Sequence, residues 1–530
     1  MTSDSPSTTH VYLVGGGIAA LASAVYLVKD AGIPGPNILI LEQDKVIGGA
    51  LDGHGDVDTG FLIRGGRMHE RRFVCYWDLL SHIPSATDPA KSVTEETFAF
   101  NELLVSCAHS RLLRGAEIVD VSSFGLGPRD KWDLARLSVA PEKSLGNRRI
   151  QDWFQPAFFD TNFWRLWESM FAFQVWSSLV EMRRYSLRFM HLFPGLHELR
   201  DILRTVYNQY DSVILPLQAW LQTQGVAFSL ETQVVDIDFR LEGTRKTATA
   251  IHCIEDGVPR TISLGEQDYV FVTNGSIVES SAVGSMTRPA ELKGKETAGT
   301  WTLWERIAAK DRAFGRPGVF SDRIDLQKWE SFTVTLRDPT FLRHLSTAYG
   351  YIPGISGLMT IIDSPWLLSL VIAAQPHFAN QPPGVEIFWG YGLYQDRLGT
   401  FVKKTMQDCT GAEILTELFG HLRISEQMRP VMEAQRINCL PVMMPFIDSV
   451  FMPRSPGDRP RVVPEGATNF AFLGQFTEIP DDCVFTVEYS VRSAQTAVYT
   501  LFHTGKRVPP VYLGGRKLKS LVQAVLAMNR

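Results

Sequence analysis

Residues 10–28, HVYLVGGGIAALASAVYLV, decide the fold, because a short apolar run leads through three glycines into apolar residues at helical spacing. His10–Val14 predicts a β-strand and Leu21–Val28 an α-helix. A second apolar run, Asn37–Glu42 (NILILE), predicts a buried parallel strand that ends in an acid. The order of strand, glycine turn, helix and strand therefore predicts a βαβ unit.

The turn has the pattern of a dinucleotide-binding site, Gly15-x-Gly17-x-x-Ala20. Gly15 permits a tight turn, Gly17 lets the backbone approach a pyrophosphate, and Ala20 lets helix and strand pack closely. The helix N-terminus offers N–H groups to the phosphates, and Glu42 is expected to accept hydrogen bonds from a ribose. An acid here disfavours NADP, because it would repel the 2′-phosphate. A plain strand–turn–helix is the simpler alternative.

Further glycines favour FAD over NAD as the cofactor. Gly48 and Gly49 follow Glu42 closely, and a second glycine-rich approach beyond the ribose acid suits a longer cofactor. Gly474, at the end of the apolar run 471–474, is expected to add another contact. From these residues alone we predict a flavin oxidoreductase.

Composition narrows the functional class. The chain has 530 residues, 45% of them hydrophobic, and a formal net charge of −5, which argues against bulk nucleic-acid binding. Met1–His10 lacks the features of a signal peptide, and no apolar run reaches the ~20 residues of a membrane span. The six cysteines form no CxxC pair, so we expect neither zinc nor a disulfide framework. A cytoplasmic location follows as the expectation.

The order of apolar runs predicts an α/β protein with a discontinuous Rossmann-like FAD-binding domain, formed by residues 1–75, 206–290 and 436–505. An inserted mixed α/β substrate domain is expected from residues 76–205 and 291–435.

Residues 506–530 predict a C-terminal basic amphipathic helix. Arg516, Lys517 and Lys519 flank an apolar face that includes Leu518 and Val522. Such a helix can lie on an anionic membrane, as a peripheral contact, or dock on its own domain. The sequence leaves both alternatives open.

A longer set of motifs is more specific. Residues 60–70 (GFLIRGGRMHE) and 75–79 (CYWDL) resemble the oleate hydratases, also called myosin-cross-reactive antigens. Similar blocks follow in family order: MFAFQ at 170–174, RRY at 183–185, YNQY at 207–210, QPHF at 375–378, FWGYG at 388–392 and GQF at 474–476. The resemblance covers about residues 10–500. It implies addition of water to the cis double bond of a free unsaturated fatty acid, as in conversion of oleate to 10-hydroxystearate. The implied cofactor is FAD, most active when reduced, without net redox change.

The resemblance also implies site residues. The motifs expected to contact FAD contain Arg64, Gly65, Gly66, Arg67, Gly474 and Gln475. Tyr185 matches the family's proton donor, and Gln209 matches a residue close to the reacting centre. The ordinary pKa of tyrosine is about 10, so protonation of the alkene is expected to be concerted with attack by water. From the residues alone, a helix tyrosine packed beside arginines is the simpler interpretation of Tyr185.

The sequence departs from the family at Met68, where the commoner motif has a glutamate that positions or activates water. A thioether cannot accept a proton. Three alternatives stay open: Glu70 takes the role, His69 acts as a base near neutral pH, or flavin and backbone hold the water without a side-chain base. We favour the third, and expect His69 and Glu70 to be exposed loop residues.

A second departure concerns the substrate carboxylate. In the family a threonine, an asparagine and a histidine around the QPHF motif hold it, and only His377 matches. Val371 and Ala373 occupy the other two places. Head-group recognition is therefore weaker or rerouted, and His377 alone is equally compatible with a core histidine.

Two other functions remain as alternatives. The bare fold is compatible with an FAD-dependent lipid oxidoreductase, and the missing glutamate with a weakly catalytic lipid- or membrane-binding flavoprotein. The sequence specifies neither the preferred fatty acid nor whether the chain is a monomer or a homodimer.

Overall fold

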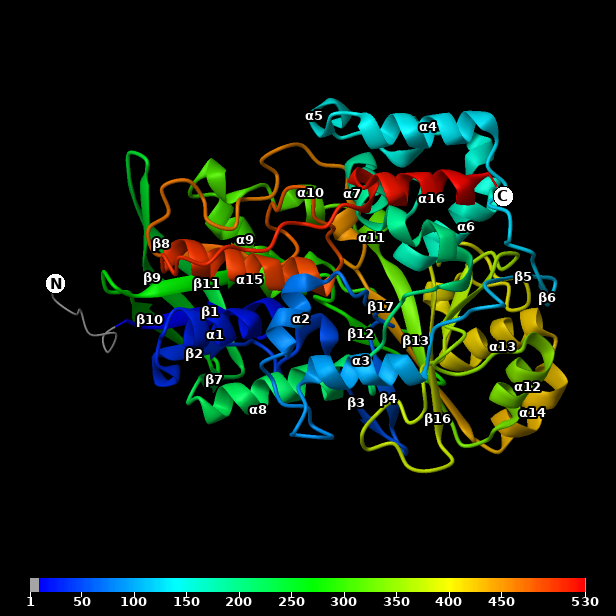
Figure 1. The fold of residues 1–530 in the computed structure, drawn as a ribbon. Coiled ribbons are helices and arrows are strands. Elements are labelled where there is room, and N and C mark those ends of the chain that lie inside the picture. The colour runs from blue at the N-terminus through cyan, green and yellow to red at the C-terminus, as the bar shows by residue number, and fades with distance from the viewer. Residues whose placement is uncertain (1–8, 530) are drawn as a thin grey trace.

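The predicted βαβ unit begins a parallel sheet in the computed structural model, which describes residues 9–529 (Figure 1). Met1–Thr8 and Arg530 lie outside the described residues, so most of the N-terminal segment and the last residue of the predicted C-terminal helix are not placed. Five strands run in the order β18-β11-β1-β2-β7. Their bounds are Val11–Val14 (β1), Ile38–Leu41 (β2), Ala227–Ser229 (β7), Tyr269–Thr273 (β11) and Phe470–Leu473 (β18).

Two helices from opposite ends of the chain pack together against this sheet: α1 (Ile18–Asp30) and α15 (Val487–Leu501). Residues Ile18–Leu27 of α1 are all buried, which explains why its apolar pattern is nearly continuous. The Tyr26 and Tyr499 rings meet edge to face with centroids 5.9 Å apart. The sheet therefore requires segments from the beginning, middle and end of the sequence, as the predicted α/β fold class anticipates.

A three-stranded antiparallel meander lies beside the five-stranded parallel sheet, where its first strand contacts β2. It consists of β8 (Thr232–Glu242), β9 (Arg245–Glu255) and β10 (Val258–Ser263), and α9 (Gly299–Ala308) packs on β8. Three more helices pack on the elements already described: α8 (Leu215–Thr223) on α1, α2 (Val74–Leu80) on α15, and α3 (Val93–Leu103) on α2.

The second large sheet has eight strands in the order β12-β17-β13-β16-β15-β14-β5-β6. Their bounds are Leu112–Arg114 (β5), Glu117–Ile118 (β6), Ala282–Val283 (β12), Trp329–Leu336 (β13), Leu358–Ile361 (β14), Leu368–Val371 (β15), Glu386–Gly392 (β16) and Ile437–Met444 (β17). Every residue of β13 is buried, because β16 and β17 pair with it on either side and the hairpin of β3 (Gly53–Asp56) and β4 (Gly60–Ile63) lies against it.

Two strands of the eight-stranded sheet come from segments predicted to belong to the cofactor domain. β17 lies within 436–505 and β12 within 206–290, yet both strands pair in the eight-stranded sheet. An apolar run shows that a strand is buried, but it does not show which sheet the strand joins. The division into domains stays a prediction.

Helices cover the eight-stranded sheet. At the right of Figure 1 lie α12 (Thr340–Tyr349), α13 (Gly411–Leu422) and α14 (Ser425–Glu433). Phe341 of α12 stacks on Phe388 of β16 with centroids 4.7 Å apart. The other helices are α4 (Pro128–Val139), α5 (Glu142–Leu145), α6 (Asn162–Phe171), α7 (Leu179–Phe189), α10 (Gly318–Ser321) and α11 (Ile324–Gln327).

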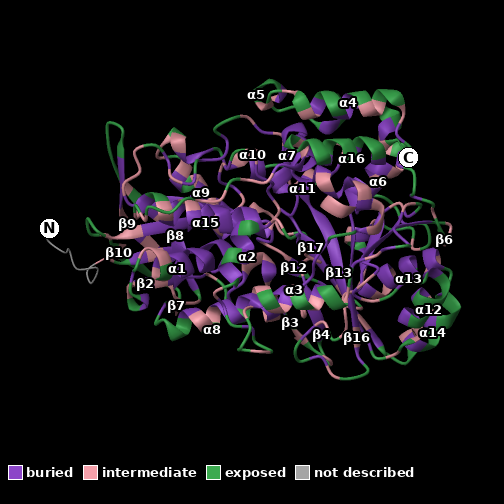
Figure 2. Cartoon of the chain, viewed as in Figure 1, coloured by how far each residue is buried: buried purple, intermediate pink, exposed green. Residues whose placement is uncertain are grey.

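The C-terminal helix α16 (Leu518–Met528) is docked on residues 190–198. It buries the small residues Ser520, Ala524 and Ala527 and leaves its larger apolar side chains outside, with Leu518 78% exposed. In Figure 2 much of α16 and of neighbouring α4 is coloured as exposed. Thus the predicted apolar face points away from the protein. In the described part of the chain, no helix is both long and apolar enough to cross a membrane.

Candidate active site

The two predicted glycine clusters lie against each other. Gly48 donates its N–H to the carbonyl of Gly16 at 3.0 Å, and Gly17 and Gly48 form an isolated parallel bridge. Gly15 has φ +96°, and a Cβ there would lie 3.3 Å from Thr273 at the end of β11. By contrast, a Cβ on Gly17 would meet no atom within 4 Å. The loop is therefore tight at Gly15 and open at Gly17.

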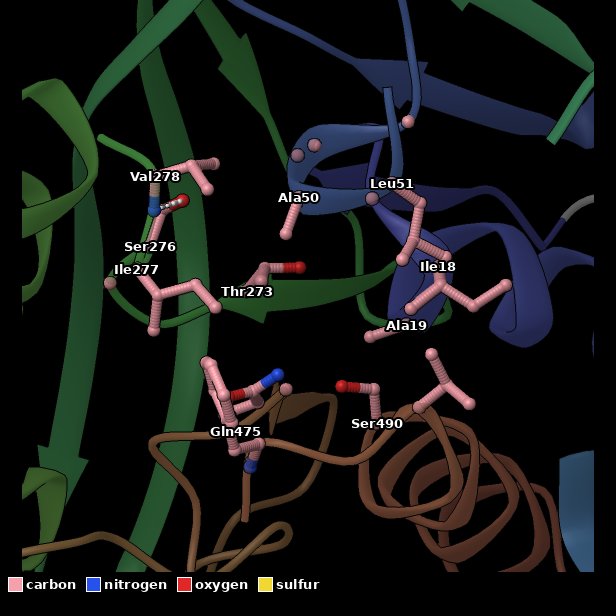
Figure 3. A pocket seen from close by; sticks show the side chains of 18 of the residues that line it. Ile18, Ala19, Ala50, Leu51, Thr273, Ser276, Ile277, Val278, Gln475 and Ser490 are labelled. Atoms are coloured by element: carbon pink, nitrogen blue, oxygen red, sulfur yellow. Dashed lines mark hydrogen bonds between the residues drawn. The ribbon is translucent and has the colours of Figure 1, made fainter. Parts of the chain in front are cut away.

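That open space is part of a cavity of about 490 Å³. Both glycine clusters line it, together with the ends of β1, β2 and β11 and residues from Gly474 to Ser490. In Figure 3 the side chains of Thr273, Gln475 and Ser490 surround the same space as Ile18 and Ala19 at the start of α1. Gly474 adopts φ +84° and donates its N–H to Ser493 Oγ at 3.0 Å. The predicted strand–glycine element near residue 474 thus borders the cavity.

Glu42 follows the end of β2 directly and lines this cavity. Its Oε2 accepts the Gly16 N–H at 2.5 Å and its Oε1 accepts the Asp44 N–H at 2.9 Å. Burial raises the pKa of this carboxyl to about 7, despite the two backbone N–H groups that favour its charged form. Each oxygen retains acceptor capacity. Glu42 is therefore positioned to receive hydroxyl donors from a ligand in the cavity.

Two arginines donate hydrogen bonds to backbone carbonyls of the second glycine cluster and of the residue that follows it. Arg64 forms an ion pair with Asp52 at 2.7 Å and donates to the carbonyl of Gly49 at 3.0 Å. Arg67 donates to the carbonyl of Ala50 at 3.0 Å, while its buried Nε has no partner among the described residues. Both arginines line the cavity.

Two residues of the predicted cofactor set do not line this cavity. Ala20 is buried inside α1, as expected for a residue that lets helix and strand pack, and Gly65 lines the neighbouring smaller cavity. Sequence reasoning missed several residues that do line it: Thr273, Ser276, Glu279 and Ser490. The apolar strand at 269–272 followed by a glycine-containing turn could have indicated Thr273, Ser276 and Glu279.

The opposite end of the cavity is apolar and contains Tyr185, with Met68, Phe171 and Phe189. Tyr185 lies on α7, is 1% exposed, and has its ring centroid 5.0 Å from those of both Phe171 and Phe173. Its hydroxyl donates to the carbonyl of Val484 at 2.5 Å. Burial raises the pKa of Tyr185 well above its ordinary value. The phenol therefore stays protonated at physiological pH.

The expectation that His69 is exposed is wrong. It is 1% exposed, because its backbone pairs with Leu203 through hydrogen bonds of 3.0 and 2.8 Å and its ring stacks on Tyr76. Gln209 Nε2 lies 2.6 Å from His69 Nε2, whereas His69 Nδ1 and Gln209 Oε1 have no partner among the described residues. Burial, with help from Arg67, lowers the pKa of His69 to about 3, so the ring is neutral at physiological pH.

Glu70 is also buried, contrary to expectation, because it is held in a charged cluster. Arg188 Nη1 lies 2.9 Å from its carboxylate and His191 Nε2 lies 3.5 Å away, while Arg72 donates its backbone N–H at 3.0 Å. Burial would raise the pKa of Glu70, but His191 and Arg188 lower it below its ordinary value. Glu70 is thus engaged as a structural anion.

A smaller cavity of about 50 Å³ adjoins the first, and the two share Ala50, Leu51, Gly66 and Arg67 as lining residues. It brings together the predicted head-group positions Val371, Ala373 and His377, and adds Gln209, Arg204 and Trp389. Burial lowers the pKa of His377 to about 4. Gln209 therefore connects the two cavities, lining the smaller one and contacting His69 in the larger.

Comparison with known proteins agrees with the motifs. A model of the MCRA family matches residues 8–499. The chain belongs to the MCRA family. The oleate hydratase of Streptococcus pyogenes serotype M49 (strain NZ131) is 38% identical to this chain, covering 98% of this chain and 89% of its own. The linoleate hydratase of Lactiplantibacillus plantarum is 33% identical, covering 92% of each chain. The resemblance inferred from the motifs is confirmed.

The MCRA chain also shares its fold with a protein of different function. Cyclohexylamine oxidase from Brevibacterium oxydans IH-35A superposes with a TM-score of 0.52 at 12% identity, covering 94% of this chain and 99% of the other. At that identity the similarity concerns the fold alone. It confirms the predicted fold class, while the MCRA relatives do not support the oxidoreductase predicted from the glycine motifs.

Proposed function

We propose that this chain is an FAD-dependent hydratase that adds water to the cis double bond of a free unsaturated fatty acid. The main observation in support is that a single cavity has two different ends. One end is lined by glycines and suits a dinucleotide, and the other is apolar and contains Tyr185. The oleate and linoleate hydratases among its relatives support the same activity.

The residues present fit FAD. Gly17 leaves open space beside the first turn of α1, whose N-terminus has no side-chain cap and so offers free N–H groups to a pyrophosphate. Glu42 offers buried acceptors suited to a ribose. When bound and reduced, the flavin would supply a negative charge that stabilises developing positive charge on the alkene.

Tyr185 is the proposed acid. Its O–H would turn from the Val484 carbonyl to the substrate, and its proton would pass to one alkene carbon while a water oxygen bonds to the other. A proton released from that water would restore the phenol. Because the raised pKa makes Tyr185 a weak acid, protonation and attack by water would be concerted. The surrounding phenylalanines keep other water from the reacting carbons.

His69 and Gln209 are the proposed holders of the attacking water. Whichever way the Gln209 amide is turned, its bond to His69 leaves at least one free donor and one free acceptor on the pair, which is the pattern that a water can satisfy. A neutral ring with so low a pKa positions water rather than removing its proton. This agrees with a mechanism without a strong side-chain base, despite Met68.

We also propose a peripheral membrane contact through α16 and α4. The Lys131 Nζ of α4 donates to Asn529 Oδ1 at 2.7 Å, joining the two segments. Their exposed large apolar side chains are Trp132, Val139, Leu518, Leu521, Val522, Val525 and Leu526. Nearby Arg516, Lys517 and Lys519 suit an anionic surface. Flotation with anionic vesicles is expected to recover the protein, and the Val522→Glu/Leu526→Glu variant is expected to remain unbound.

The activity is tested by incubating the protein with oleate and reduced FAD in H₂¹⁸O. A hydratase gives hydroxy acid that carries one ¹⁸O and consumes no oxidant. Net electron transfer would identify the lipid oxidoreductase instead, and oleate recovered unchanged would identify a lipid-binding flavoprotein.

A further inference from the structure

Arg204 is a buried cation without a counter-ion. It is 8% exposed and lines the smaller cavity. Its Nη1 donates to Ser106 Oγ at 2.6 Å and to the carbonyl of Gly354 at 3.3 Å, both neutral groups. Its Nη2 has no hydrogen-bond partner among the described residues, and no carboxylate in residues 9–529 lies within ion-pair distance of it.

Arg111 repeats this situation close by. It is fully buried, its Nε donates to the carbonyl of Leu358 at 3.1 Å, and both Nη atoms lack partners within the described part of the chain. Burial and, to a smaller extent, the charge of Arg204 lower the pKa of Arg111 to about 10. The two guanidinium groups therefore lie close enough to repel each other.

Other buried arginines in this protein are neutralised. Each forms an ion pair with at least one carboxylate: Arg183, Arg184, Arg188, Arg454, Arg459 and Arg492. A buried charge without a partner is strongly disfavoured, and proteins retain one where a ligand or metal completes the pair. Arg204, which lines the cavity while Arg111 does not, thus indicates an anion-binding site.

Two further polar groups at this cavity lack partners. Trp389 Nε1 and His377 Nδ1 are buried and make no hydrogen bond to any residue in 9–529. Neutral His377 can donate through Nδ1, and Trp389 can only donate. With Arg204 Nη2, they are three buried donors without partners on residues that line this cavity. Val371 and Ala373 line it as well, and the one carboxylate among its described lining residues, Asp52, is paired with Arg64.

We infer that Arg204, supported by Arg111, binds the carboxylate of the fatty acid in the smaller cavity. The inference rests on the proposed function, whose substrate is a free acid. A space of about 50 Å³ accommodates a head group but not an alkyl chain. The chain would continue into the large cavity past Gly66 and Arg67, which border both. A charged anchor thereby replaces the two neutral side chains that the family resemblance implies at positions 371 and 373.

Stearate is the probe of choice because it carries the carboxylate but no double bond to hydrate. Its affinity for the FAD-loaded full chain is measured by titration calorimetry in wild type, Arg204→Met, Arg204→Lys and Arg200→Met. Arg204→Met is expected to weaken binding about 10- to 100-fold, the range for a hydrogen bond to a charged group, and Arg204→Lys less. Arg200 is exposed and paired with Glu198, so Arg200→Met is the matched control and is expected to bind like wild type.

Unchanged stearate affinity in Arg204→Met would overturn the inference. Should that variant fail to fold, wild type alone decides: a charged anchor requires tighter binding of stearate than of methyl stearate, and equal binding would overturn it. Stearate binding is independent of catalysis, so a failed ¹⁸O experiment tests the proposed function separately. With oleate as substrate, Arg204→Met is expected to raise KM by more than it lowers kcat.

Discussion

The two ends of the large cavity are built in different ways. The cofactor end consists mainly of backbone, from glycine turns and strand ends that hold their shape through main-chain hydrogen bonds such as Gly48 N–H to Gly16 O. The apolar end consists of side chains from separate segments of the chain, including His69 and Tyr185. Gln209 does not line this cavity but contacts His69. Substitutions at the first end are therefore expected to affect binding of the cofactor, and those at the second to affect chemistry.

Gly17→Val gives the largest expected effect. Gly17 has φ −78° and open space at its Cβ position, so valine is tolerated by the fold but fills the space needed by a pyrophosphate. We expect purified protein without flavin and without hydratase activity, and an apoprotein melting temperature close to that of wild type. Stoichiometric yellow flavin in the variant would show that the cradle is misassigned.

Tyr185→Phe is the matching change at the other end. It removes the proposed proton donor and keeps the ring between Phe171 and Phe173. We expect the hydration rate to fall by about 10²- to 10⁴-fold, the usual contribution of a general acid, with flavin content unchanged. Rates near those of wild type would remove Tyr185 from the mechanism.

Glu70→Gln separates structure from chemistry at the apolar end. It leaves Arg188 buried without its carboxylate, so we expect a loss of roughly 3–5 kcal/mol in the free energy of unfolding. The rate per folded, flavin-loaded molecule is expected to stay within about threefold of wild type. Denaturant unfolding and flavin-normalised kinetics measure the two quantities. A large rate loss with little change in stability would make Glu70 the base after all.

The smallest effect concerns pH at the cofactor end. Glu42 has a pKa of about 7 in the protein alone, and ribose hydroxyls donate to its ionised form. Protonation below that pKa therefore weakens FAD binding, so affinity is expected to fall about tenfold between pH 8 and pH 6. Glu42→Gln has no proton to gain and is expected to bind weakly at both values. An equal pH dependence in the variant would exclude Glu42 as the titrating group.

The same contrast explains how much could be predicted from the sequence. The βαβ unit and its glycines were predictable because strand, turn, helix and acid lie within 33 consecutive residues, from His10 to Glu42. The family could be inferred because its motifs are long. His69 was mispredicted because its burial depends on pairing with Leu203, more than a hundred residues later. Arg204 could not be singled out from the sequence, because the absence of an ion-pair partner can be recognised only in the three-dimensional structure.

The wall shared by the two cavities has a thermodynamic consequence. Gly66 and Arg67 line both cavities, so a flavin in one and a carboxylate in the other would contact the same short segment. Any factor by which FAD changes the affinity for fatty acid must equal the factor by which fatty acid changes the affinity for FAD. If bound FAD raises the affinity for fatty acid, bound fatty acid slows the loss of FAD to the same degree, and if FAD lowers that affinity, fatty acid promotes its release.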